Sequence, residues 1–320
     1  MTVSSICTKN YTWRSKIITS QSLPVISKRV KPRLHGWRAV WTPQTFRRLV
    51  QLSFAAFIVV VSVQHATAGA ESGNLTASAE AYCPFGGLET LYQYITSGGS
   101  FVSHTHLSNV VLLVAVLLTA LLLRSAFCGW ICPLGFLQDL VSNLSNVLQK
   151  RFTGFRRAMT NLKKRGARLA FLDRYLRYLK YLVLVWAVVG AAYYGFMVFR
   201  DYDPWAALLN IAEFSFTPGI IILGVTLLAS FFVERSWCRY ACPLGAASGL
   251  LGKFSPVYLK REGDACKVCQ ICTKACPMGL EVHTATTIKS VDCVTCLECV
   301  GACPRNGALD VKIGLPLLGK

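Results

Sequence analysis

The sequence predicts an all-α membrane domain with four transmembrane helices in two repeated helix pairs, followed by a small C-terminal α+β domain built on two cysteine boxes. Three observations carry this prediction. Hydrophobic residues make up 53% of the 320 residues, 15% are charged and the mean hydropathy is +0.44, a composition typical of integral membrane proteins. Four uncharged apolar runs are each about long enough to cross a bilayer. Of the 14 cysteines, all but Cys7 and Cys83 stand in short repeated motifs.

The four apolar runs lie near residues 48–68, 107–124, 179–199 and 215–233. A hydrocarbon core of about 30 Å takes roughly 20 helical residues at about 1.5 Å each. Backbone polar groups in lipid must be satisfied within the chain, and runs such as NVVLLVAVLLTALLL lack the alternation of a barrel strand, so we predict helices. The stretch RRLVQLSFAAFIVVVSVQHATAGA also has the pattern of a secretory signal. We disfavour that interpretation because 46 residues precede it.

The net charge of +19 is confined to alternate loops. Residues 1–48 carry ten Lys or Arg and no acid, and residues 124–178 carry eleven against two acids, whereas 69–106 and 200–214 together carry one basic residue against six acids. This distribution indicates membrane topology rather than a nucleic-acid partner. By the positive-inside rule, both termini and the cysteine motifs face the cytoplasm. We therefore predict a multi-pass protein of the bacterial cytoplasmic (inner) membrane.

Three domains follow from this topology. Residues 1–46 form a basic cytoplasmic extension, residues 47–255 the four-helix membrane domain, and residues 256–320 the cysteine-box domain. The basic link 141–178 has the pattern of an amphipathic basic segment, and we favour a solvated loop near anionic headgroups over a specific role.

The membrane domain contains an internal repeat. LLLRSAFCGWICPLGFLQDL and FFVERSWCRYACPLGAASGL align at an offset of 110 residues, which predicts a repeated two-helix unit. Each copy carries a CxxxCP motif, with Cys128 and Cys132 in the first and Cys238 and Cys242 in the second. Cysteines four apart share one helical face, and the proline is expected to end the helix. The duplication favours a redox or metal role. A shared four-cysteine metal or cluster site, a reversible redox pair and small packing residues all stay open.

The two boxes are CKVCQICTKACP, residues 266–277, and CVTCLECVGACP, residues 293–304. CxxCxxCxxxCP is the bacterial two-cluster ferredoxin run, in which the fourth cysteine ligates the other cluster. We assign one [4Fe-4S] cluster to Cys266, Cys269, Cys272 and Cys303, and a second to Cys276, Cys293, Cys296 and Cys299. Zinc is disfavoured, because its sites use CxxC pairs or Cys/His mixtures with longer gaps. The hydrophobic residues between the ligands, Val268, Ile271, Val294 and Leu297, are expected to fill the domain core.

The outer loop AYCPFGGLETLYQYITSGGSFVSHTHLSN is rich in glycine, aromatic residues and histidine. Such a loop could seat a quinol head group, whose oxidation releases protons and so needs acceptors. The candidates are Glu89, His104 and His106. Each of them, taken alone, is more often an interfacial polar residue than a catalytic base.

From about residue 40 onward, these features together resemble the NapH family of ferredoxin-type membrane quinol dehydrogenase subunits. The features are the apolar runs, the FCGWICPLG and CRYACPLG corners, the outer YCPFGGLETLYQ segment and the two boxes. They are also similar to the membrane and C-terminal portion of NosR-like proteins. The resemblance implies electron transfer between membrane quinol and a redox partner, such as a cytochrome, of an anaerobic respiratory pathway. The alternative is an accessory or regulatory protein that supplies electrons for metalloenzyme maturation or gene control.

Overall fold

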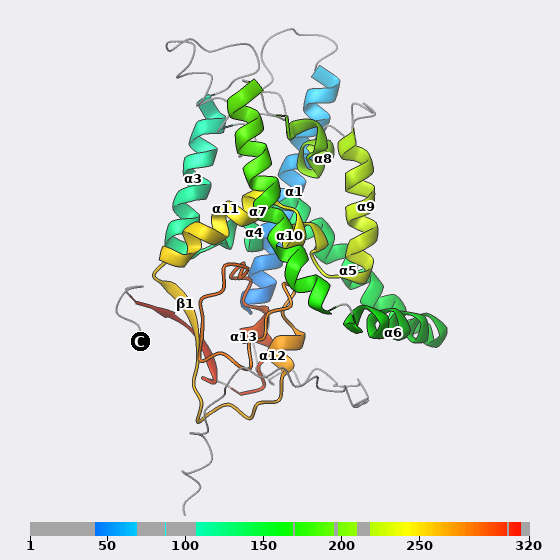
Figure 1. The fold of residues 1–320 in the computed structure, drawn as a ribbon, viewed down its shortest axis with the longest axis vertical. Helices are drawn as coiled ribbons and strands as arrows, with labels where there is room; N and C mark the ends of the chain where they lie inside the picture. The colour runs from blue at the N-terminus through cyan, green and yellow to red at the C-terminus, as the bar shows by residue number, and fades with distance from the viewer. Residues whose placement is uncertain are drawn as a thin grey trace, which may run out of the picture. The chain divides into compact units, whose positions relative to one another are not determined.

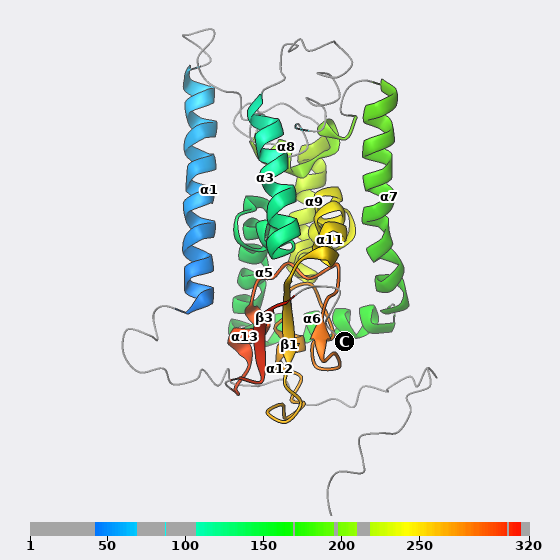
Figure 2. The ribbon, with the colours of Figure 1, turned by 90° about the vertical axis from the view of Figure 1, so that its left-hand side faces the viewer.

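Long apolar helices form one end of the molecule, and the cysteine boxes form the other (Figures 1 and 2). The computed structural model describes residues 42–68, 87, 107–168, 170–194, 198–209, 218–305 and 307–314, which all belong to one contact unit, residues 33–320. The elements follow in the order α1 (Pro43–Ala68), α3 (Leu107–Leu123), α4 (Ala126–Trp130), α5 (Pro133–Arg151), α6 (Thr153–Arg168), α7 (Ala170–Tyr194), η4 (Arg200–Tyr202), α8 (Pro204–Leu209), α9 (Pro218–Phe232), α10 (Ser236–Tyr240), α11 (Pro243–Leu251), η6 (Gly252–Phe254), β1 (Val257–Arg261), α12 (Ile271–Lys274), β2 (Thr287–Ile288), α13 (Glu298–Ala302) and β3 (Leu309–Ile313).

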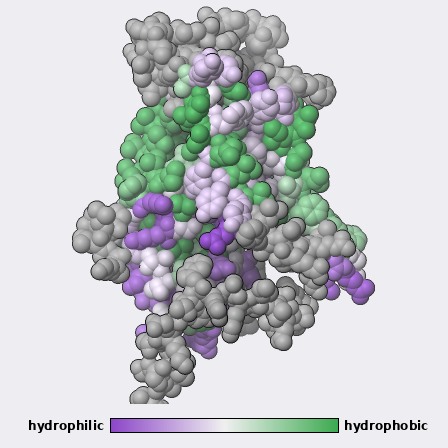
Figure 3. Space-filling model, viewed as in Figure 1, coloured by the Kyte–Doolittle hydropathy of each residue, from purple (hydrophilic) through white to green (hydrophobic). Residues whose placement is uncertain are grey.

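Each of the four predicted apolar runs forms a helix, namely α1, α3, α7 or α9. Two stretches, Pro43–Gln64 and Asp173–Tyr194, are long and apolar enough to cross a membrane, whereas α3 and α9 have 17 and 15 residues. Large apolar side chains point outward from these helices, for example Leu182 with 66% and Ile221 with 72% of its surface exposed. Figure 3 shows hydrophobic residues over this part of the visible face and hydrophilic ones toward the opposite end. The described residues thus contain two candidate membrane spans.

The internal repeat is visible as the successions α3-α4-α5 and α9-α10-α11. In the turn after each long helix stands an arginine with a left-handed backbone, Arg124 (φ 59°) or Arg235 (φ 52°). A five-residue helix follows, and the second cysteine of each motif caps the next helix, whose first residue is proline. The prediction that both cysteines of a motif share one helix is therefore wrong. Proline begins a helix here, because its missing N–H costs nothing at the first helical position.

The basic link 141–178 is helical rather than a solvated loop, so that prediction is also wrong. Its residues lie in α5, α6 and the start of α7. The Ser142 hydroxyl of α5 donates to the Ser230 carbonyl of α9 at 2.8 Å. On α6, Met159 is 2% exposed, and Phe155 packs edge-on against Phe231 at 5.7 Å between ring centroids. Apolar residues spaced among the basic ones give these helices a side to bury, which a charge count does not show.

The C-terminal part is a small α+β unit. Its sheet has the order β2-β1-β3, with both pairings antiparallel, and Leu259 on the central strand is opposite Ile288 and Val311. Leu259, Ile288, Val282 and Leu309 form a core that also buries Cys293 and Cys299. The sheet thereby supports the box that carries these two cysteines.

Candidate metal centres

The twelve motif cysteines are free thiols, and most of them lie beside other cysteines of the motifs. Burial raises the pKa of Cys272, and the Cys303 and Cys269 thiols raise it further. Burial also raises the pKa of Cys299, and there the added effect comes from Cys296, Cys293 and Cys276. Thiols that raise one another's pKa lie close together. The fourth cysteine of each box thus lies beside the other box, as crossed ligation requires, while the ligand assignment itself stays a prediction.

The backbone of the two boxes is contorted in the same way. In each, the residues before and after the second cysteine have positive φ: Val268 (51°) and Gln270 (60°) in the first box, Thr295 (48°) and Leu297 (59°) in the second. Left-handed backbone is an outlier for β-branched residues and costs roughly 1–3 kcal/mol per residue. Positive φ turns backbone N–H groups inward, and such groups form concave anion sites. The box backbone therefore fits a negatively charged cluster.

Backbone N–H groups are directed at the sulfurs. Hydrogen bonds from the Val268 N–H are the main cause that lowers the pKa of Cys266. At Cys293 and Cys296, burial raises the pKa, and N–H groups of Thr295 and Glu298 act in the opposite direction. Hydrogen bonds of this kind stabilise thiolate and tune the potential of an iron–sulfur cluster.

In the described part of the chain, no three or more His, Cys, Asp or Glu side chains converge closely enough to hold one metal ion.

The two boxes differ in exposure. Among the described cysteines, Cys269 alone is exposed, and its neighbour Val268 is 56% exposed. In the second box, Val294 and the cysteines 293, 296 and 299 are each exposed by 8% or less. The expectation that Val268 fills the core is wrong, whereas it is confirmed for Val294. The first box faces solvent and the second faces the helices.

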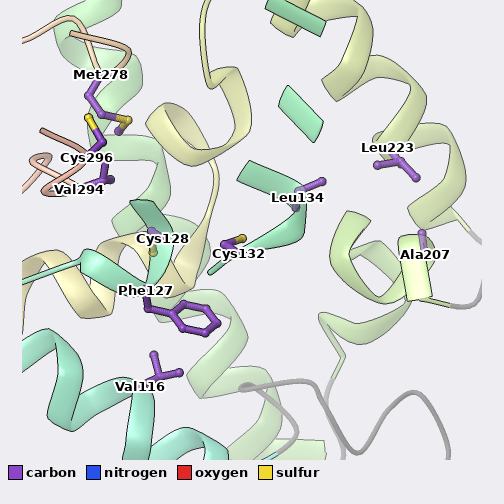
Figure 4. Close-up of a cluster of buried hydrophobic side chains, with 10 residues drawn as sticks. All are labelled: Val116, Phe127, Cys128, Cys132, Leu134, Ala207, Leu223, Met278, Val294 and Cys296. Carbon is purple, nitrogen blue, oxygen red and sulfur yellow. The ribbon is translucent and has the colours of Figure 1, made fainter. Parts of the chain in front are cut away.

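The second box lies directly on the first CxxxCP corner. A Cβ atom at Gly129 would come within 2.2 Å of the Val294 carbonyl oxygen, so the two backbones are in contact. The Trp130 indole N–H donates to the Thr295 carbonyl at 3.0 Å. Cys296 belongs to the same buried cluster as Cys128 and Cys132 (Figure 4). The candidate cluster site of box two and the CxxxCP cysteines are therefore neighbours.

The CxxxCP motifs bring their four cysteines together. Burial raises the pKa of Cys242, and Cys238, Cys128 and Cys132 raise it further. All four thiols line one cavity of about 40 Å³. A single water needs about 10–15 Å³ by this measure, so this cavity, which other side chains also line, exceeds one water molecule. The shared four-cysteine site that the sequence left open stays a prediction.

Each repeat supplies polar contacts to the other repeat's first cysteine. Gln138 of α5 donates to Cys238 Sγ at 3.5 Å, and Ser248 of α11 lies 3.8 Å from Cys128 Sγ. Both partners stand ten residues after the first cysteine of their own motif (138 − 128 and 248 − 238). Within its own motif, Cys242 Sγ accepts the Gly245 N–H at 3.3 Å. The site is thus pseudo-symmetric, with reciprocal contacts that sequence reasoning missed.

A buried charge network holds this site. Asp139 of α5 accepts from Arg235 at 2.8 and 2.7 Å and from Arg47 of α1 at 2.6 Å. Arg235 also donates to the Cys128 carbonyl at 3.1 Å and is 0% exposed. Burial alone would raise the pKa of Asp139, but the two guanidinium groups outweigh it and lower the pKa. Sequence reasoning missed this network, although its signal was present: the two acids among the basic residues 124–178 are Asp139 and Asp173, and both are ion-paired.

The candidate proton acceptors Glu89, His104 and His106 lie outside the described residues, as do Cys7 and Cys83.

These elements define an iron–sulfur electron-transfer protein with apolar helices. A family model described as a 4Fe-4S binding domain matches residues 105–152 and 215–261, which are the two CxxxCP repeats, and one described as a 4Fe-4S dicluster domain matches residues 258–304. The chain is 31% identical to YccM of Escherichia coli (strain K12), over 75% of this chain and 65% of that protein. It is 31% identical to an uncharacterized protein of Methanocaldococcus jannaschii, over 61% of this chain and 75% of that one.

The ferredoxin-type protein NapH of Escherichia coli (strain K12) is 28% identical, over 62% of this chain and 67% of its own length. Proteins named NirI and NosR match shorter parts. This chain belongs to the NapH-type polyferredoxin group. It spans just under two thirds of the length of YccM. No solved structure matches it.

Proposed function

We propose that this chain is a quinol dehydrogenase-type subunit that passes electrons between membrane quinol and a redox partner of an anaerobic respiratory pathway. The observation that carries the proposal is the packing of Cys296 with Cys128 and Cys132 in one buried cluster. This packing supports a CxxxCP site between the helices and the boxes. Cysteine sites then succeed one another from the apolar helices to the exposed edge at Cys269.

The proposed cofactors are two [4Fe-4S] clusters in the boxes and a third cluster at the CxxxCP cysteines. Cys266, Cys269, Cys272 and Cys303 would hold cluster one; Cys276, Cys293, Cys296 and Cys299 cluster two; Cys128, Cys132, Cys238 and Cys242 the third. When bound, such clusters take up and release single electrons. The chain's part is to bury the thiolates, direct backbone N–H groups at them and exclude water.

The proposed membrane arrangement has four transmembrane helices, α1, α3, α7 and α9, in the bacterial inner membrane. The shortness of α3 and α9 is compatible with spanning if the bilayer thins or if the preceding residues continue the span. The charge distribution supports cytoplasmic placement of both termini and of the boxes. The division into residues 1–46, 47–255 and 256–320 belongs to the same proposal.

Quinol oxidation releases two protons, and Glu89, His104 and His106 are proposed acceptors on the outer side. A redox partner that accepts the electrons on that side would need a route for them back across the membrane. A cytochrome partner would supply one.

The test begins with the anaerobically purified full chain. Iron and acid-labile sulfide are counted, and cluster reduction by a ubiquinol and a menaquinol analogue is followed by electron paramagnetic resonance. About twelve irons per chain are expected for three cubanes, against about eight for two. Replacing Cys238 by Ser should lower the count toward eight. Colourless, iron-free protein, or intact clusters that neither quinol reduces, would contradict the proposal.

A second candidate function is favoured by one relative, the regulatory protein NosR of Stutzerimonas stutzeri, which is 29% identical over 55% of this chain. An accessory protein would supply electrons for maturation or control without steady turnover. In that case quinol would reduce the clusters once. Adding the membrane fraction that contains the redox partner would then not sustain quinol consumption. Continuous consumption would favour the dehydrogenase.

A further inference from the structure

A series of aromatic rings leads from the outer apolar surface to the CxxxCP site. Trp186 of α7 lies 5.8 Å from Tyr202 and 6.0 Å from Phe199 between ring centroids, both edge-on. Phe199 in turn stacks on Trp237, at 6.4 Å and 22°. Trp186 and Tyr202 are each 42% exposed, whereas Phe199 is 3% exposed. Because Trp237 directly precedes Cys238, the rings connect the surface of α7 with the four thiols.

Two unusual polar groups stand beside these rings. Asp203 is 7% exposed, and one of its two carboxylate oxygens, Oδ1, accepts a hydrogen bond from the Trp205 backbone N–H at 3.0 Å. The Trp205 indole N–H is buried and has no hydrogen-bond partner among the residues that the structure describes. Both side chains line the same cavity as the four cysteines, together with Phe199 and Trp237. A buried donor without a partner costs roughly 1–3 kcal/mol, so a bound group that accepts from it would be stabilised there.

A purely structural role of these side chains explains only part of this arrangement. Trp186 and Tyr202 could be interfacial aromatic residues that anchor the helices, and Asp203 could merely cap the turn before α8. An interfacial anchor does not require Phe199 and Trp237 to continue the series inward. A turn cap works equally well in solvent and does not require burial of the carboxylate.

We propose that the head group of a quinol binds beside Trp186, Tyr202 and Phe199, with Asp203 as the acceptor of one quinol proton and the Trp205 indole N–H as donor to a quinol oxygen. This inference rests on the proposed function and names the place where it occurs. An aromatic head group with two opposed oxygens matches stacking rings, one donor and one acceptor. The quinol enters from lipid, where the exposed rings lie.

The step balances in protons and electrons. Oxidation of the quinol breaks two O–H bonds and yields the quinone, two protons and two electrons. One proton forms a carboxylic O–H on Asp203, and the second passes to water or to a base of the outer loop. The two electrons would leave singly to an iron–sulfur cluster that Cys128, Cys132, Cys238 and Cys242 would hold, which would serve as the one-electron acceptor.

The ionisation of Asp203 suits this role. Burial raises its pKa to about 7, and the Trp205 N–H acts in the opposite direction. A proton acceptor works best when its pKa lies near the working pH. Besides the cysteines, the titratable side chains that line the cavity are Lys180 and Asp292, which pair with each other. The rate of quinol oxidation should therefore rise with pH through about 7, as the carboxylate becomes free to accept a proton.

The experiment compares Asp203→Asn with Asp201→Asn in the full chain, each with its iron counted. Asp201 is exposed and two residues away, which makes it a matched control. Cluster reduction is followed anaerobically with decylubiquinol and with menadiol as electron donors, and separately with dithionite. We expect Asp203→Asn to slow quinol-driven reduction about 100-fold and to abolish its rise with pH, since general base catalysis contributes about 10²–10⁴-fold. Dithionite reduction and the Asp201→Asn rates should stay unchanged.

A second variant guards against misfolding of the first. Trp186→Leu changes the half-exposed ring at the surface end of the series, and it should raise the KM for the quinol with little change in kcat or iron content. Wild-type pH profiles and rates for Asp203→Asn, or an unchanged KM for Trp186→Leu, would overturn the site while leaving the proposed function intact. If intact wild-type clusters respond to dithionite but to neither quinol, the proposed function fails and this inference fails with it. Loss of activity in Glu89, His104 or His106 variants alone, with Asp203→Asn normal, would place the proton acceptor in the outer loop and overturn the proposal.

Discussion

Replacing Asp139 by Asn should destabilise the protein far more than an ordinary surface change. Asp139 carries the countercharge for two arginines whose side chains are 0% and 4% exposed, Arg235 and Arg47. Removing one partner of a buried pair costs about 3–5 kcal/mol, because the other charge stays buried without compensation. Arg47 keeps its second partner, Glu298, at 2.9 Å, so the cost comes mainly from Arg235. We expect Asp139→Asn to lower the free energy of unfolding by about 3–5 kcal/mol in total.

The assay is thermal unfolding of the purified protein in detergent. At roughly 2 °C per kcal/mol for a domain of this size, the midpoint should fall by about 6–10 °C. The matched control is Glu262→Gln, which breaks the Lys260–Glu262 pair, whose side chains are 42% and 45% exposed. That pair should contribute about 0–1 kcal/mol. Equal small shifts for both variants would refute the reasoning.

A double variant separates the ion pair from simple packing loss. Replacing Asp139 by Leu and Arg235 by Met removes both charges, and apolar replacement of a whole buried pair is often neutral or stabilising. The double variant should therefore be more stable than Asp139→Leu alone. The pH dependence gives a further check. The pKa of Asp139 is below its ordinary value of 3.8, so its stabilisation is fully present above that value and is lost as pH falls through the folded-state pKa. Wild type and Asp139→Asn should converge in acid.

Three further predictions concern the sites. Gly129→Ala should displace the second box, because the added Cβ would meet the Val294 carbonyl oxygen at 2.2 Å. The control is Gly154→Ala, whose added Cβ has nothing within 4 Å. We expect the first variant to lower the free energy of unfolding by about 1–3 kcal/mol and the second to raise it slightly, as measured by thermal unfolding together with iron content. A chelator with mild oxidant should remove iron from the exposed first box before the buried second one, seen as biphasic bleaching, and monophasic loss would contradict the exposure argument. Gln138→Leu should shift the reduction potential of the CxxxCP site and leave both box signals unchanged in a redox titration, since Gln138 donates to Cys238.

Local signals in the sequence were sufficient to predict the helices but not the tertiary contacts that these helices make. The run predicted at 107–124 forms α3 at Leu107–Leu123. Both bounds were predicted closely, because the apolar residues begin and end with the helix. The run predicted at 179–199 begins too late, since α7 starts at Ala170. Its first turns carry charges that a search for uncharged runs rejects. Those charges are ion-paired within the protein: Arg177 binds Asp292 of the box domain, and Asp173 binds Arg239.

The candidate sites show the same division. Box spacing predicted a tight local turn around the first three cysteines of each box, because only two residues separate successive cysteines. The contacts between Gln138 and Cys238 and between Ser248 and Cys128 join residues 100 and 120 positions apart. No local pattern encodes such pairs. The repeat offset was the available signal, since any residue that contacts the other motif implies a counterpart 110 positions away.

The symmetry of the repeat is broken at the residue after each first cysteine, and this asymmetry orients the box domain. In the first repeat that residue is Gly129, which admits the backbone of the second box. In the second repeat it is Arg239, whose guanidinium lies against Gly279, just after the fourth cysteine of the first box. Each repeat thus holds one box.

Under crossed ligation, cluster two takes one thiolate from the first box, Cys276, and three from the second. Holding the two boxes at these points would turn the proposed cluster two toward the CxxxCP cysteines and leave the proposed cluster one at the solvent edge. An exchange of Gly129 and Arg239 would remove the backbone contact and place a cation against the wrong box. The order of the proposed electron carriers would therefore depend on a difference between two otherwise equivalent positions.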